Sequence, residues 1–250
     1  MRLLNKTAVV TGAAGGIGQA IVRKILAEGG RVVAADLSVD SLKVFNDFPT
    51  DKLVTFSVDV TDYKQVEAMV AHAVTRFGQL DIVINNAGIG SAKPLLEHDP
   101  LGDFDSVTNV NQKGVYHGIV AGGRQFRAQG TKGVILNTSS VYATIASEMT
   151  FTYNVSKAAV DMMTKCAAPL GVRVCAIAPG RVDTPMLRQY EALGLWEHIR
   201  KEQMRQEFTL PSEIADVAVF LVSDEANCIN GCTVHASDGF ENFKYPLQKE

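Results

Sequence analysis

The 250-residue chain has little of what builds metal centres, disulfide frameworks or membrane spans. Its four cysteines lack C-x-x-C spacing, and its five histidines stand singly, so we expect no metal site and no disulfide framework. No apolar run reaches the ~18 residues of a membrane span, and the apolar run in MRLLNKTAVV is too short for a signal peptide. We therefore expect no membrane association and a cytoplasmic location.

The chain also lacks a large excess of charge. Its formal net charge is −3, and acidic and basic residues alternate without a basic block, so nucleic acid is not an expected partner. Hydrophobic residues make up 46% of the sequence, which suffices for a large core. No repeat, low-complexity tract or Pro/Ser-rich linker interrupts the chain, and we therefore expect one domain over residues 1–250.

Short apolar runs alternate with longer amphipathic segments along the chain. Strands are expected at 7–11, 31–35, 53–58, 81–85, 133–138, 172–178 and 233–236. Helices are expected near 17–28, 39–46, 62–77, 104–128, 151–168 and 211–222. This alternation predicts an α/β, doubly wound parallel sheet of seven strands with helices on both faces. An amphipathic insertion at 184–209 is either a lid over a pocket or a plain packed helix pair.

A glycine-rich turn, TGAAGGIGQAIV, follows the first expected strand and opens the first expected helix; its key glycines are Gly12, Gly16 and Gly18. Small residues there let backbone N–H groups and the helix N-terminus approach a pyrophosphate. Asp36 ends the second strand, where a carboxylate accepts hydrogen bonds from a ribose and repels a 2′-phosphate. Ala13, Ala14 and Leu37 offer no cation to such a phosphate. We therefore expect NAD rather than NADP; the alternative is that Asp36 only neighbours a helix cap.

A tyrosine and a lysine stand four residues apart in TYNVSKAAVDMM, residues 152–163. One helical turn separates Tyr153 from Lys157, so both side chains lie on the same face of the helix. A nearby cation stabilises phenolate over phenol and lowers the pKa of the hydroxyl, which could then exchange a proton with an alcohol. The alternative is two interfacial side chains that extend to water.

These motifs resemble those of the short-chain dehydrogenase/reductases, and the resemblance covers essentially the whole chain. In order, the matching segments are TGAAGGIG, DVT at 59–61, NNAG at 85–88, NVN at 109–111, NTSS at 137–140, the YxxxK pair and PGRVDT at 179–184. The resemblance implies a Rossmann-type fold and a catalytic set of Asn111, Ser140, Tyr153 and Lys157. It also implies cofactor contacts from Gly12, Gly16, Ile17, Gly18, Asp36, Asp59, Val60, Asn86, Ala87, Gly88, Tyr153, Lys157, Pro179, Gly180, Val182 and Thr184.

The resemblance also assigns roles. The lysine would bind the nicotinamide ribose and lower the pKa of Tyr153, which would act as the acid/base. Ser140 would hydrogen-bond the substrate oxygen, and Asn111 would hold a water that connects Lys157 to solvent. In the family the helix that carries Tyr153 usually packs against its copy, which implies a homo-oligomer, a dimer or homotetramer. Here Pro169 ends that helix about one turn early, which bears on those contacts.

The leading hypothesis is an NAD-dependent oxidoreductase that interconverts a small secondary alcohol, diol or hydroxyketone and its ketone by hydride transfer. One alternative is a 3-oxoacyl-carrier-protein reductase, which would want NADPH and a cation near position 13 or 37. Another is a non-catalytic NAD-binding redox sensor. Candidate substrate contacts are Ser140, Tyr142, Met149, Arg181, Tyr190 and Trp196. Arg181 could pair with a carboxylate or phosphate of the substrate, or it could be solvated.

Overall fold

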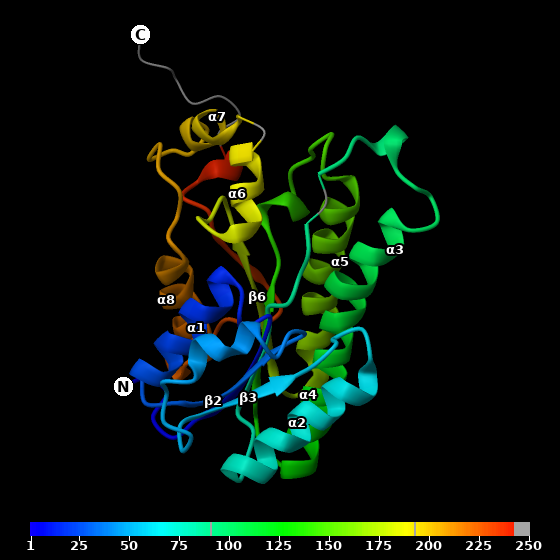
Figure 1. Ribbon diagram of the computed structural model, residues 1–250. Helices are drawn as coiled ribbons and strands as arrows, with labels where there is room; N and C mark the ends of the chain where they lie inside the picture. The colour runs from blue at the N-terminus through cyan, green and yellow to red at the C-terminus, as the bar shows by residue number, and fades with distance from the viewer. Residues whose placement is uncertain (91, 193, 243–250) are drawn as a thin grey trace.

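The computed structural model describes residues 1–90, 92–192 and 194–242, which fold around a seven-stranded sheet (Figure 1). The strands are β1 (Thr7–Thr11), β2 (Arg31–Asp36), β3 (Leu53–Ser57), β4 (Ile82–Asn85), β5 (Val134–Thr138), β6 (Arg173–Pro179) and β7 (Thr233–Ala236). Their order is β3-β2-β1-β4-β5-β6-β7, and every neighbouring pair is parallel. The predicted doubly wound, Rossmann-type sheet is confirmed.

Strand β1 lies inside the sheet between β2 and β4, and this position explains why its middle residues, Ala8, Val9 and Val10, are apolar. Val9 pairs with Val33 of β2 on one side and with Val83 of β4 on the other. Every residue of β1 is buried, as expected for a central parallel strand covered on both faces. The chain order of the strands reverses between β1 and β4. In open α/β sheets this switch point opens a crevice at the carboxyl ends of the strands.

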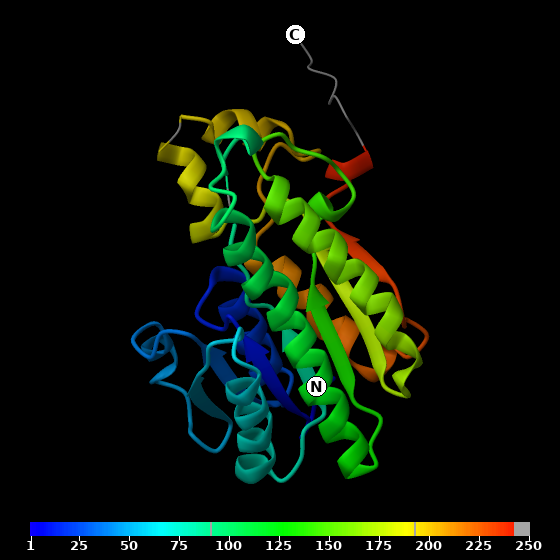
Figure 2. The same ribbon diagram turned by 90° about the vertical axis from the view of Figure 1, so that its right-hand side faces the viewer.

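Helices cover both faces of the sheet (Figures 1 and 2). They are α1 (Gly16–Ala27), α2 (Tyr63–Phe77), α3 (Asp103–Thr108), α4 (Gly114–Gln129), α5 (Phe151–Ala167), α6 (Pro185–Ala192), α7 (Trp196–Lys201) and α8 (Pro211–Val222). Helices α1 and α8 pack on one face, and α2, α4 and α5 pack on the other. Because strand side chains alternate, Val10 joins the first core and Val9 the second.

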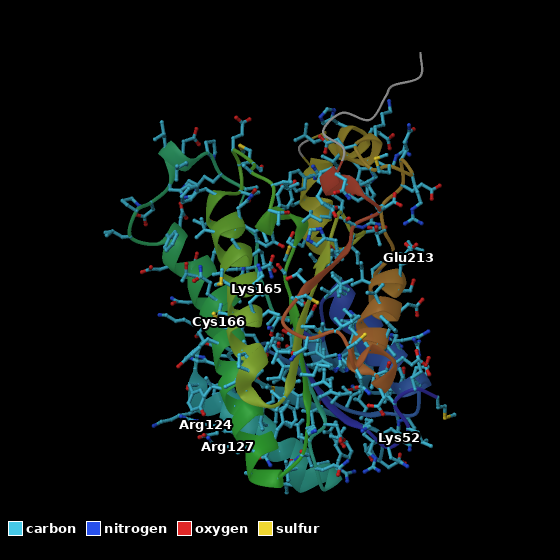
Figure 3. All side chains as sticks on the ribbon, turned by 180° about the vertical axis from the view of Figure 1, so that it is seen from behind. Lys52, Arg124, Arg127, Lys165, Cys166 and Glu213 are labelled. Carbon is cyan, nitrogen blue, oxygen red and sulfur yellow. The ribbon has the colours of Figure 1, made fainter. Side chains whose placement is uncertain are left out.

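Buried and exposed residues along the helices that pack on the sheet match this arrangement, in which one side of the helix faces the sheet and the other faces solvent. Along α4, Val115 and Phe126 are buried against the sheet, whereas Arg124 and Arg127 are exposed. Figure 3 shows those two arginines together on the outer surface. No described helix combines the length and the apolar character that a transmembrane span requires.

Two expected helices differ in the structure. The segment expected at 39–46 is a 3₁₀ helix, Ser41–Phe45, whose buried residues Leu42 and Phe45 are three apart, the repeat of that tighter helix. The helix expected at 104–128 contains a π-helical turn, Asn109–Lys113, between α3 and α4. Hydrophobic periodicity could not reveal this turn because it interrupts the 3.6-residue repeat for only five residues.

Candidate active site

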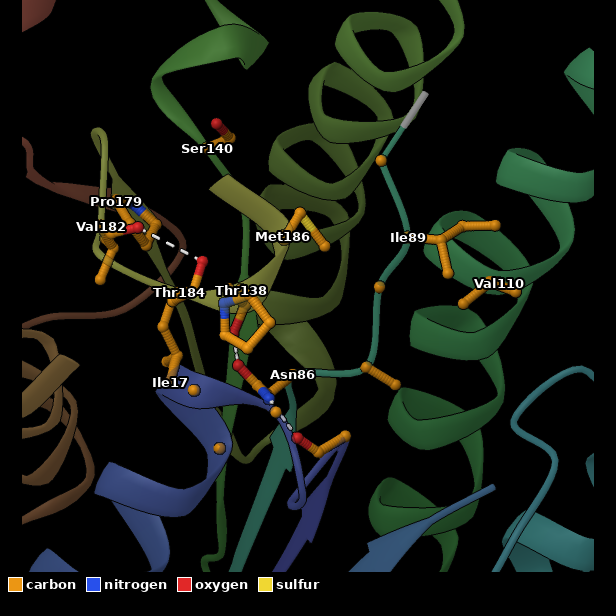
Figure 4. A pocket seen from close by; sticks show the side chains of 18 of the residues that line it. Ile17, Asn86, Ile89, Val110, Thr138, Ser140, Pro179, Val182, Thr184 and Met186 are labelled. Atoms are coloured by element: carbon orange, nitrogen blue, oxygen red, sulfur yellow. Dashed lines mark hydrogen bonds between the residues drawn. The ribbon is translucent and has the colours of Figure 1, made fainter. Parts of the chain in front are cut away.

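A cavity of about 590 Å³ opens at the carboxyl edge of the sheet, at the switch point between β1 and β4. The loops after β1, β2, β4, β5 and β6 line it, together with the start of α5 and helix α6. Figure 4 shows this lining, with Ile17, Asn86 and Thr184 on one side and Ile89 and Val110 on the other. Strands that end together thus gather residues that are far apart in the sequence.

The glycine-rich turn forms one wall of the cavity and cannot carry larger side chains. Gly12 has φ +61°, and a Cβ there would lie 2.8 Å from the Cα of Ala87. A Cβ on Gly18 would lie 2.1 Å from the carbonyl oxygen of Gly12. The N-cap of α1, Gly15, supplies no side-chain hydrogen bond to the first backbone N–H groups of the helix. These donors therefore remain available to an anionic ligand.

Asp36 lies at the end of β2 and lines the same cavity. Its Oδ2 accepts a hydrogen bond from Ala14 N at 2.9 Å, and its Oδ1 accepts one from Leu37 N at 2.8 Å. These two bonds orient the carboxylate, and each oxygen keeps a lone pair for a further donor. Among the described residues that line the cavity, the only lysine or arginine side chains are Lys157 and Arg181. Neither belongs to the segments around Asp36.

The NNAG segment braces the loop after β1. The Nδ2 of Asn86 donates to the carbonyl oxygens of Thr11 and Gly12, each at 3.1 Å. One residue earlier, Asn85 Nδ2 donates to Asn137 Oδ1 at 2.9 Å across β4 and β5. These buried amides tie together the strands that carry the cavity residues.

Lys157 is buried, with 3% of its surface exposed, although it lines the cavity. Its Nζ donates to the carbonyl oxygen of Thr138 at 2.7 Å and lies 5.5 Å from the ring centroid of Tyr153. Burial lowers the pKa of Lys157 to about 8, and the carboxylate of Asp161 acts in the opposite direction. The ammonium is therefore held at a fixed point beside Tyr153.

This burial has a consequence for stability. Between the folded pKa of about 8 and the unfolded value of 10.5, the unfolded chain binds more protons, so the free energy of unfolding rises with pH. From about pH 7 to about pH 9, Lys157 should contribute an increase of about 1 kcal/mol. We expect Lys157→Met to lose this increase in urea denaturation, whereas Lys165→Met, an exposed lysine on the same helix, should keep it. Equal pH profiles for the wild type and Lys157→Met would contradict the burial effect.

Tyr153 differs from the expectation based on its lysine neighbour. Burial raises the pKa of Tyr153 to about 12, and the nearby Ser140 hydroxyl, which can donate to the phenolate, only partly offsets this effect. The expectation of a lowered pKa is wrong for this structure. The ammonium of Lys157 donates to the Thr138 carbonyl, and the largest influence on the pKa of Tyr153 is the removal of its phenol from water. Tyr153 is consequently a phenol at neutral pH.

Ser140 and Asn111 are the other two members of the predicted catalytic set. Ser140 is buried two residues beyond the end of β5, where its Oγ accepts from Tyr142 N at 3.2 Å. Asn111 lies in the π-helical turn, fully buried behind the cavity wall. Its Oδ1 accepts from Ile89 N at 2.9 Å, and its Nδ2 donates to Ile89 O and Ser156 Oγ, each at 3.0 Å. Asn111 therefore positions the chain beside the cavity and does not line it.

Comparisons with known proteins agree with this arrangement. The sequence model of a family described as Enoyl-(Acyl carrier protein) reductase matches residues 12–241. The chain is 36% identical to 3beta-hydroxysteroid dehydrogenase 2 of Eggerthella lenta, over 96% of each chain. The chain belongs to the short-chain dehydrogenase/reductase family. A diacetyl reductase, (S)-acetoin forming, of Staphylococcus epidermidis is a further relative of this short-chain dehydrogenase/reductase, 31% identical over 94% of this chain and 98% of its own.

A solved structure supports the same membership. The crystal structure of a short-chain type dehydrogenase/reductase from Mycobacterium marinum superposes with a TM-score of 0.88 at 28% identity, covering 95% of this chain and 96% of that one. The chain is accordingly a short-chain dehydrogenase/reductase that acts on CH–OH groups, and its family uses NAD or NADP.

Every residue that the short-chain dehydrogenase/reductase resemblance predicted to contact the cofactor lines the cavity. Only some of the candidate substrate contacts line the cavity. Ser140, Tyr142, Arg181 and Tyr190 line the cavity, whereas Met149 and Trp196 do not. Trp196 packs against Phe208, with ring centroids 4.4 Å apart, and Met149 is 37% exposed.

Helix α6 also brings side chains to the cavity that the sequence did not single out, namely Met186, Leu187 and Gln189. The sequence indicates a possible lid at 184–209, but which of its side chains face the cavity depends on tertiary packing. Ile89 and Val110 are two further apolar lining residues. Ile89 follows the NNAG motif directly and Val110 is the middle residue of NVN, and these positions were the available signal.

Proposed function

We propose that the protein is an NAD-dependent oxidoreductase that interconverts a small secondary alcohol, diol or hydroxyketone and its ketone. The observation that carries this proposal is the meeting of Ser140, Tyr153 and Lys157 with the glycine turn and Asp36 in one cavity. The cavity thus combines the proton donor Tyr153 and the hydroxyl of Ser140 with a dinucleotide-binding edge. A redox sensor without catalytic activity would need the dinucleotide-binding edge but not the tyrosine and the serine.

The residues at the carboxyl edge of β1 and β2 fit a dinucleotide. The uncapped N-terminus of α1 and the glycine turn would hold the pyrophosphate, because Gly15 and Gly16 line the cavity without a side chain that shields the backbone donors. The oriented carboxylate of Asp36 would accept the adenosine ribose hydroxyls. Lys157 would donate to the nicotinamide ribose, and Thr184, whose Oγ1 donates to Val182 O at 3.3 Å (Figure 4), would bind the carboxamide.

Three groups would share the work on the substrate. When bound, the nicotinamide accepts or supplies the hydride. Because Tyr153 is protonated at neutral pH, its hydroxyl would donate a proton to the carbonyl oxygen as a ketone is reduced, and alcohol oxidation would reverse that transfer. Ser140 would donate a hydrogen bond to the same oxygen and stabilise its developing negative charge.

Lys157 and Asn111 would support the acid/base. Lys157 supplies a positive charge 5.5 Å from the ring of Tyr153, which favours phenolate during alcohol oxidation. Asn111 Oδ1 and Lys157 Nζ both approach Gly88, since a Cβ on that glycine would lie 3.3 and 3.5 Å from them. Their proximity supports the proton path from Lys157 past Asn111 toward solvent.

A carrier-protein substrate is the second candidate because the matching family model carries an acyl-carrier-protein description. We favour a small substrate because the lining near Asp36 supplies no cation for the 2′-phosphate of NADPH. The relative that forms (S)-acetoin also shows that related chains of this length reduce small diketones. The homo-oligomer expected from the family stays a prediction, which sedimentation velocity would measure.

The decisive experiment follows reduced-nicotinamide absorbance with NAD(H) and NADP(H) over small diols, acetoin, diacetyl, a 3-hydroxysteroid and an acetoacetyl thioester. We expect the highest kcat/KM for NAD(H) with a diol or hydroxyketone. Preference for the thioester with NADPH would favour the carrier-protein reductase. Binding of NADH without turnover of any compound would favour the alternative of a non-catalytic redox sensor.

A further inference from the structure

Arg181 is a charged side chain in the wall of the proposed substrate cavity. It follows the Pro179–Gly180 loop at the end of β6, and only 10% of its side chain is exposed. Its guanidinium lies over the Phe240 ring, 5.2 Å from the centroid. Of the two alternatives for Arg181, the solvated one is therefore excluded. A buried cation requires a counter-charge.

Glu202 supplies that counter-charge from the insertion between β6 and α8. It follows α7 directly, and its Oε2 lies 2.5 Å from Arg181 Nη2. The carboxylate is 35% exposed, and its other oxygen lies 3.6 Å from the exposed His198 ring. Arg181 is thus neutralised before any substrate enters the cavity.

The ion pair lies close to the proposed reaction centre. The ring of Tyr142 is edge-on to that of Tyr153, with centroids 6.3 Å apart. Burial raises the pKa of Tyr142, the charge of Arg181 lowers it, and Tyr190 and Glu202 raise it. Tyr142, Tyr153 and Arg181 line the same cavity, so a substrate that reacts at Tyr153 shares that cavity with the Arg181 side chain.

We propose that Glu202 is a specificity-determining residue: by neutralising Arg181 in the cavity wall, it makes the site select uncharged substrates over carboxylates. This inference rests on the proposed alcohol/ketone activity and names the substrate class of the same site. A carboxylate that approaches Arg181 also meets the negative charge of Glu202. Its attraction to Arg181 therefore does not offset the free-energy cost of removing its water.

The test compares butyrate with butyramide, two probes of nearly equal shape that differ in charge. Their dissociation constants would be measured by ligand-observed NMR on the purified protein with NADH present. We expect wild type to favour butyramide. Glu202→Gln should shift the affinity ratio toward butyrate by about tenfold, because it unmasks the Arg181 cation. Arg181→Met should shift the ratio further toward butyramide, and the double variant should return to the wild-type ratio.

Glu197→Gln is the matched control, because it removes the same charge from an exposed residue of α7 that pairs with Arg200 at 2.7 Å. The ratio of its affinities for butyrate and butyramide should equal that of wild type. An unchanged ratio in Glu202→Gln, or failure of both probes to bind every variant, would overturn the inference. The readout needs no turnover. Absence of alcohol oxidation would therefore count against the proposed function alone.

Discussion

Replacing Tyr153 by phenylalanine is expected to lower kcat by about a thousandfold in both reaction directions, because the variant retains the ring but has no proton to exchange. The ring contacts, edge-on to Tyr142 at 6.3 Å and 5.5 Å from Lys157 Nζ, do not involve the hydroxyl. The fold and NADH binding should therefore persist. Stopped-flow or steady-state absorbance of NADH measures the rate, and fluorescence titration measures cofactor binding.

Tyr116→Phe provides a matched control, because this tyrosine is exposed on α4 and does not line the cavity. Its kcat should equal that of wild type. Turnover by Tyr153→Phe within a few-fold of wild type would remove the tyrosine from the mechanism. In that case another group would have to supply the proton.

A double substitution at the end of β2, Asp36→Ala with Leu37→Arg, is expected to change the ratio of kcat/KM for NAD to that for NADP by about a hundredfold in favour of NADP. The carboxylate of Asp36 would repel a 2′-phosphate, and the exposed position 37 could present a guanidinium to it. Both residues line the cavity, so the change acts directly on the proposed adenosine end. Initial rates with each cofactor measure the ratio.

Asp40→Ala is the control for charge alone, because Asp40 is exposed and pairs with Lys43 at 2.7 Å. It should leave the ratio unchanged. A wild-type protein that already prefers NADP, or a double variant with the wild-type ratio, would show that Asp36 does not select the cofactor.

The strands and the glycine turn could be predicted because their signals are local. Central parallel strands need apolar runs such as the AVV of TAVVT, and a Cβ on Gly18 would collide with the backbone of Gly12 in the same turn. The tyrosine and lysine share a helix face because they stand four residues apart. Such features depend on neighbours a few residues away, so the sequence alone specified them.

Other properties depend on residues that meet only when the chain has folded. The pKa of Tyr153 rises because its phenol is buried, and helix periodicity contains no measure of burial. Met149 and Trp196 stand near the motifs in sequence but lie outside the cavity lining.

Arg181 meets Glu202, which stands 21 positions later in the chain, and no local pattern predicts that contact. The family and the chemistry of its motifs could thus be inferred from residue type and spacing. The charge that a substrate meets in the cavity was decided by tertiary packing, because electrostatic interactions depend on distance in space and on exclusion of water, not on separation along the chain.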